Sequence, residues 1–77
     1  MVKAFVLIEM VAGHSRDLVN ALKERKVVSD VNRVTGPYDV IAVFEAADHN
    51  EISDIVATEV HTLTGVVRTI TCVSLER

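Results

Sequence analysis

The chain has 77 residues, 49% of them hydrophobic, and a formal net charge of −3. This length predicts a single domain, and an acidic balance without a basic block argues against direct binding to nucleic acid, which needs a positive surface. The apolar run from Ala4 to Ile8 falls far short of the roughly 20 residues that span a membrane. The single cysteine, Cys72, permits no internal disulfide, so the composition predicts a protein of the reducing cytoplasm.

The first half of the chain predicts a strand, a helix and a second strand. Residues 2–10 (VKAFVLIEM) are rich in β-branched and large apolar types without a turn former, which is typical of a strand. A helix is expected from Ser15, whose hydroxyl suits an N-cap, to about Lys26, because apolar residues recur between them at helical spacing. Residues 27–35 (VVSDVNRVT) mix valines with polar residues, which favours a strand at the edge of a sheet.

The second half repeats this order after a turn at residues 36–37 (Gly-Pro). Residues 39–46 (DVIAVFEA) form a nearly continuous apolar run, which indicates a central strand. Asp48 is placed to cap the next helix, Gly65 is placed to end it, and residues 66–75 (VVRTITCVSL) predict the last strand. The apolar face of that second helix is expected to comprise Ile52, Ile55, Val56, Val60 and Leu63.

The order β-α-β-β-α-β predicts an α+β, ferredoxin-like fold. Right-handed crossovers place both helices on one face of a four-stranded antiparallel sheet with the strand order 4-1-3-2. The two central strands are apolar on both faces, whereas two helices cover only one. The uncovered face carries roughly four large side chains, each worth about 1.5–3 kcal/mol when buried. We therefore predict a homodimer, packed sheet to sheet in the manner of dimeric α/β barrels, as the minimum unit.

No group of residues has the pattern of an active site. His14, His49 and His61 lack the spacing of metal ligands, so we expect surface histidines and no metal. Cys72 has no nearby base and is expected to be a small thiol of the core. The three glycines are too widely separated to form a phosphate-binding loop. The sequence therefore predicts neither enzymatic activity nor a cofactor.

Two segments carry a more specific pattern. The turn at residues 36–39 holds the only proline and tyrosine of the chain, followed by a carboxylate. Its backbone amides suit a ligand carboxylate, and the side chain of Asp39 suits an ammonium group. Thr69 and Thr71 lie two apart on a strand, so their hydroxyls share a face and suit a small polar ligand. An ordinary hairpin turn and ordinary strand threonines are the alternatives.

Residues 34–41 (VTGPYDVI), the Ile-Val helix and residues 65–71 (GVVRTIT) resemble the C-terminal effector domain of the Lrp/AsnC family, called the RAM domain. The resemblance covers essentially the whole chain. It implies sheet-to-sheet dimers that assemble into octamers or decamers, with an amino acid effector bound where dimers meet. Pro37 stands at a variable position of the turn motif and removes one backbone amide. The ligand-binding residues that the resemblance implies are Gly36, Tyr38, Asp39, Thr69 and Thr71.

Because residue 1 lies at the start of the first predicted strand, residues 1–77 are expected to form a stand-alone RAM domain without the helix-turn-helix of typical family members. The resemblance then implies a non-enzymatic amino acid sensor that regulates transcription by mixing into oligomers of full-length Lrp/AsnC regulators. Two alternatives stay open. One is a small dimeric α/β-barrel enzyme that uses His14 or His61, and the other is a structural oligomerisation module without a ligand.

Overall fold

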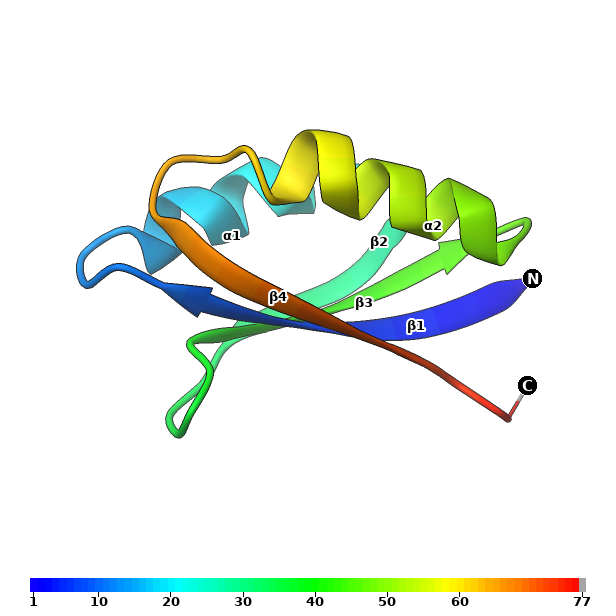
Figure 1. The fold of residues 1–77 in the computed structure, drawn as a ribbon, viewed down its shortest axis with the longest axis horizontal. Helices are drawn as coiled ribbons and strands as arrows, with labels where there is room; N and C mark the ends of the chain where they lie inside the picture. Colours follow the sequence, from blue (N-terminus) through cyan, green and yellow to red (C-terminus); the bar gives the residue numbers. More distant parts are fainter. Residues whose placement is uncertain (77) are drawn as a thin grey trace.

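A computed structural model describes residues 1–76. Its four strands form one antiparallel sheet in the order β2-β3-β1-β4, and both helices lie on the same face of that sheet (Figure 1). The predicted ferredoxin-like fold and strand order are therefore confirmed. The elements are β1 (Val2–Met10), α1 (Ser15–Lys23), β2 (Val28–Arg33), β3 (Val40–Ala46), α2 (His49–Ile55), the π-helical segment η1 (Val56–Val60) and β4 (Val66–Val73).

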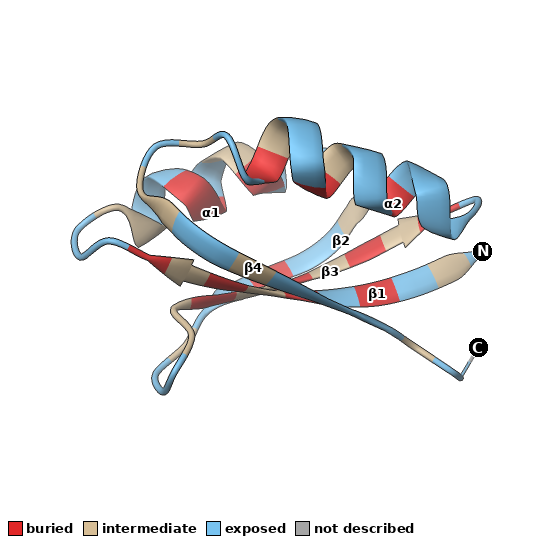
Figure 2. Cartoon of the chain, viewed as in Figure 1, coloured by how far each residue is buried: buried red, intermediate tan, exposed pale blue. Residues whose placement is uncertain are grey.

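The core lies between the helices and the two central strands, β1 and β3. Alternate residues of these strands point to the helices and are buried, as the period of two along a strand requires (Figure 2). Large and small side chains alternate across the ladder: Phe44 stands opposite Ala4, and Val6 stands opposite Ala42. The helices contribute Leu18, Val19, Leu22, Ile52, Val56 and Val60.

The other face of the sheet is apolar as well. We define the open sheet face as the side chains of Phe5, Leu7, Ile41, Val43 and Ile70. The register pairs Phe5 with Val43 and places Leu7 between Ile41 and Ile70, so these side chains form one continuous patch. Phe5 and Ile70 are 37% and 38% exposed. The expectation that the central strands are apolar on both faces is confirmed.

The first helix differs from its prediction at both ends. Ser15 is its first residue, and the N-cap position belongs to His14, whose side chain makes no capping hydrogen bond. The backbone explains this shift, because the His14 carbonyl accepts from the Leu18 amide at 3.3 Å and thereby starts the helix. The helix ends at Lys23 rather than near Lys26. The prediction that Ser15 caps the helix is wrong.

Three strands are shorter than predicted. Strand β3 begins at Val40 rather than at Asp39. Strand β2 covers residues 28–33 rather than 27–35, because its pairing with β3 stops at Arg33 opposite Val40, where the hairpin turn begins. Strand β4 covers residues 66–73 rather than 66–75, because its pairing with β1 stops at Ala4 opposite Val73. The polar composition that placed β2 at an edge of the sheet agrees with the observed order.

The second helix begins as predicted. Asp48 Oδ1 accepts a hydrogen bond from the Glu51 amide at 2.9 Å, and the Glu51 carboxylate accepts one from the Ala47 amide at 3.4 Å. The two acidic side chains thus satisfy amides that the helix itself cannot bond.

Asp48→Ala is expected to lower the free energy of unfolding by about 1 kcal/mol, because the amide of the first turn loses its acceptor. Asp54→Ala, in the same helix but away from the cap, serves as the control and is expected to change it by less than about 0.5 kcal/mol. Urea denaturation followed by circular dichroism measures both. Equal losses in the two variants would contradict the capping role.

Helix α2 widens at its end into η1, a feature that the sequence analysis did not predict. The His61 amide donates to the Val56 carbonyl at 2.8 Å, a bond that spans five residues as in a π-helix. Thr58 Oγ1 donates to the Asp54 carbonyl at 2.6 Å, a contact of the type that bends helices. Ile52, Val56 and Val60 are buried, while Ile55 and Leu63 pack partly buried against the core, as the periodicity predicted.

Candidate functional site

The turn between β2 and β3 is tied to strand β1 by Asp39. The turn bends away from the helices, as Figure 1 shows, and Gly36 adopts a φ of +126° that favours glycine. The Asp39 carbonyl accepts from the Val34 amide at 2.9 Å, and the Asp39 amide donates to the Ile8 carbonyl at 2.9 Å. Its carboxylate oxygen Oδ2 accepts from the Met10 amide at 2.7 Å. Asp39 therefore joins the hairpin to strand β1 through two hydrogen bonds and closes the hairpin with a third.

This geometry bears on the predicted role of the Asp39 carboxylate. One acceptor site of its carboxylate is already bonded to the Met10 amide, so a ligand ammonium group would share this carboxylate with the backbone. Asp39 is half-buried and borders a shallow pocket at the start of α1. The remaining lining residues of that pocket are Ser15, Arg33, Val34 and Thr35.

Asp39→Ala is expected to lower the free energy of unfolding by about 2 kcal/mol even without a ligand, because the Met10 amide loses a charged acceptor. Asp39→Asn keeps an acceptor oxygen and is expected to lose less. Thermal denaturation of the three proteins without added amino acids measures this order. A wild-type melting temperature for Asp39→Ala would contradict the structural role of the carboxylate.

Arg68 connects the two segments that the sequence singled out. Its guanidinium carbon lies 5.6 Å from the centre of the Tyr38 ring, a cation–π geometry. Its Nη2 atom lies 3.1 Å from Glu9 Oε1, in a pair that is also in register across β1 and β4. Arg68 belongs to the GVVRTIT segment, but it is not among the ligand-binding residues predicted from the sequence. The one feature of the sequence that could have indicated a role for Arg68 in the site is its position directly before Thr69.

Thr69 and Thr71 lie on the opposite face of β4 from Arg68. They stand in register with Ile8 and Val6, whose side chains point to the helices, and thus share a face as their spacing predicted. The helices do not bury them: Thr71 is exposed and Thr69 is half-buried. Neither threonine borders the pocket beside Asp39. A single chain therefore presents the predicted ligand-binding residues on two sides of the sheet.

The structure also places the histidines and the cysteine that the sequence raised as candidates. Within residues 1–76, no three His, Cys, Asp or Glu side chains are arranged to hold a metal ion. His49 and His61 are exposed, and His14 is half-buried. Cys72 is exposed rather than part of the core, so that prediction is wrong. It stands opposite Phe5 on an outer strand, on the face that the helices leave free. No helix among residues 1–76 is long and apolar enough to cross a membrane.

Comparison with known proteins places nearly the whole chain in a single protein family. The profile of the Lrp/AsnC ligand binding domain matches residues 3–77. Protein TTHA0845 of Thermus thermophilus is 36% identical, and the superposition covers 100% of this chain and 96% of that one with a TM-score of 0.93. No curated protein matches the sequence.

Two regulators share the fold at lower identity. Escherichia coli AsnC is 17% identical, with 99% of this chain and 52% of that chain covered and a TM-score of 0.89. Transcriptional regulator NMB0573 of Neisseria meningitidis, solved as a complex with L-Met, is 18% identical, with 97% and 50% covered and a TM-score of 0.88. The chain thus spans about half the length of each regulator.

Proposed function

Since the chain belongs to the Lrp/AsnC ligand-binding domain family, we propose that it is a non-enzymatic, cytoplasmic domain that binds an amino acid and modulates transcription through full-length Lrp/AsnC regulators. The observation that carries the proposal is the family match over residues 3–77, which includes both the 36–39 turn and the threonine pair. A related regulator was solved with L-Met, an amino acid. The chain corresponds to about half of that regulator.

The placement of the predicted residues supports a ligand site between chains. The Tyr38 ring packs on Arg68 on one face of β4, whereas Thr69 and Thr71 point from the other face. Because the two groups project from opposite faces of β4, a ligand that contacts both fits best where a second copy brings one group to the other. Arg68 offers a positive charge for the ligand carboxylate, and Thr69 offers a hydroxyl.

The open sheet face supports a dimer as the building block of a larger ring of four or five dimers. Its apolar centre is bordered by charged pairs: Lys3 stands opposite Glu45 at one end, and Glu9 stands opposite Arg68 at the other. An apolar centre with a polar rim is the usual anatomy of a protein interface. Two copies packed through this face would each cover the apolar patch of the other.

Isothermal titration calorimetry with the common amino acids tests ligand binding. Tyr38→Ala and Thr69→Val are each expected to weaken the affinity for the best ligand by about tenfold or more, because each removes a direct contact. Thr62→Val, outside the predicted site, is the matched control for Thr69→Val and is expected to bind normally. If no amino acid binds to the wild-type protein at millimolar concentration, the sensor function is refuted.

Co-purification with a full-length Lrp/AsnC regulator from the same cell tests the transcriptional part. Mixed oligomers are expected, because the two chains share the same domain fold. If the two proteins form only separate oligomers after co-expression, the proposed route to transcription is wrong, whereas ligand binding would stand.

A further inference from the structure

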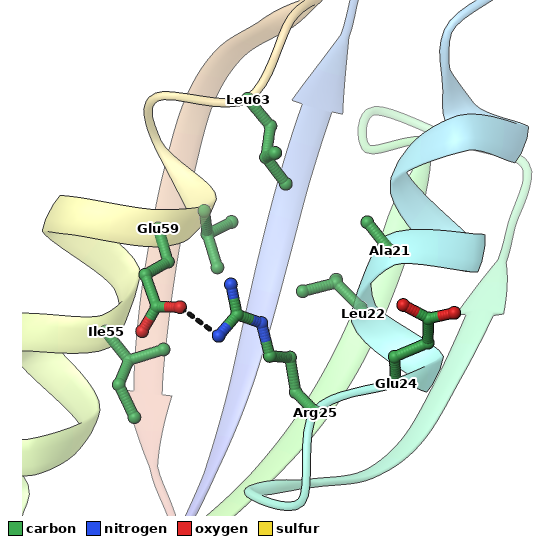
Figure 3. Close-up of a pocket in the computed structure, with 8 residues that line it drawn as sticks. Ala21, Leu22, Glu24, Arg25, Ile55, Glu59 and Leu63 are labelled. Carbon is green, nitrogen blue, oxygen red and sulfur yellow. Dashed lines mark ion pairs between the residues drawn. The ribbon is translucent and has the colours of Figure 1, made fainter.

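A cleft separates the end of α1 from the end of α2 and η1 (Figure 3). Neither the 36–39 turn nor the threonine pair lines it. Its volume of about 340 Å³ falls in the range of roughly 300–1,000 Å³ found for small-molecule sites. The lining residues are Ala21, Leu22, Glu24, Arg25, Ile55, Glu59, Val60 and Leu63.

The π-helical segment shapes one wall of the cleft. Val60 is fully buried, while Glu59, one residue earlier, reaches into the cleft from the same turn (Figure 3). A π-helical turn is uncommon and is found disproportionately at functional sites, because it shifts the side chains around it. The aliphatic carbon that the cleft exposes comes from the partly buried Ala21 on one wall and Ile55 and Leu63 on the other, above the buried Leu22 and Val60.

Two opposite charges face each other across the cleft. Arg25 forms an ion pair with Glu59, drawn as a dashed line in Figure 3. The side chain of Arg25 is 51% exposed and that of Glu59 is 35% exposed. A pair this close to solvent contributes little to stability, so a ligand that replaces each partner opens it at small cost. Glu24 adds a second carboxylate to the lining.

We propose that this cleft is a second ligand site, for a free α-amino acid with a branched aliphatic side chain. The ligand carboxylate pairs with the Arg25 guanidinium and its ammonium group pairs with the Glu59 carboxylate, in place of the protein's own ion pair. The ligand side chain lies on the aliphatic floor. That floor holds no hydroxyl or amide side chain, so a polar ligand side chain would lose its hydrogen bonds. This site does not depend on the proposed function.

Titration of the isotope-labelled protein with L-leucine, followed by amide NMR, tests the proposal. Saturable shifts are expected for residues 21–25 and 55–63. Two probes each keep one of the charges: 3-methylbutylamine lacks the carboxylate, and 4-methylpentanoate lacks the amine. Each is expected to bind at least about tenfold more weakly, because one ionic contact is missing. Equal binding of all three probes, or no saturable shift at these residues with millimolar leucine, would overturn the proposal.

Variants separate this cleft from the proposed effector site. Arg25→Gln and Glu59→Gln are expected to weaken the leucine-induced shifts by about tenfold or more, since each removes one ionic contact. Lys23→Gln, two residues before Arg25 at the end of α1 and outside the cleft, is the matched control for Arg25→Gln and leaves the shifts unchanged. Tyr38→Ala, which disables only the other site, also leaves them unchanged. Shifts that persist in Arg25→Gln and Glu59→Gln while the spectra remain folded would refute the assignment.

Discussion

Gly65→Ala is expected to destabilise the domain by about 2–5 kcal/mol, a large share of the roughly 5–15 kcal/mol that holds a domain together. Two effects add at this position. Gly65 has a φ of +90°, which an L side chain rarely adopts, and an added Cβ would lie 2.6 Å from the Cβ of His14. The backbone cannot move away easily, because the Gly65 carbonyl accepts from the Val11 amide at 2.7 Å.

Gly13→Ala separates these two effects. Gly13 has nearly the same φ, +89°, but an added Cβ meets nothing within 4 Å, so only the backbone cost of about 1–2 kcal/mol is expected. Removing the clash with His14→Gly should restore part of the stability that Gly65→Ala loses. Chemical denaturation of the single and double variants measures this coupling. Equal losses for Gly65→Ala and Gly13→Ala would show that the contact with His14 is unimportant.

Ile41→Asp is expected to convert the proposed dimer, and any larger assembly built from it, into an 8.4 kDa monomer. Ile41 lies on central strand β3 within the open sheet face, beside Leu7. A sheet-to-sheet dimer would bury the introduced carboxylate without a partner, which costs about 3–5 kcal/mol for each such charge. The dissociation constant of the dimer is therefore expected to rise by at least about a hundredfold.

Sedimentation velocity at micromolar concentration measures this change. Val11→Asp introduces the same charge in the β1–α1 loop, where Val11 is 51% exposed, and is expected to leave the assembly intact. Circular dichroism establishes that Ile41→Asp remains folded. If its sedimentation coefficient equals that of the wild-type protein, the open sheet face is not the dimer interface.

Much of the fold follows from local pattern. The apolar composition of residues 2–10 and 40–44 identifies the central strands, but both of their faces are apolar, so the pattern does not decide which face the helices bury. The start of α1 was predicted less well because Ser15 is a good capping type, whereas the backbone of the preceding loop places His14 at that position. The π-helical turn leaves the apolar spacing of the second helix unchanged, so periodicity does not reveal it.

The geometry of the candidate site was harder to predict than the fold, because it depends on contacts between residues far apart in the sequence. The carboxylate of Asp39 meets the amide of Met10, 29 residues away, and no local motif indicates that bond. The contact of Arg68 with Tyr38 likewise exists only because β4 lies beside β1 near the hairpin turn. The prediction that Cys72 lies in the core failed for a related reason: its position within a strand indicated burial, but the helices cover the other face of the sheet.

The register of β1 with β4 also determines when the domain can fold during synthesis. Strand β1 leaves the ribosome first, yet one of its two neighbours is the last strand, with Ala4 pairing with Val73. The four-stranded sheet therefore cannot be completed until residue 73 has emerged from the exit tunnel of the ribosome. Contacts so distant in sequence form slowly, because a long loop must close first. Until then the nascent chain exposes the apolar residues 4–8, an unpaired strand segment of the kind that promotes aggregation.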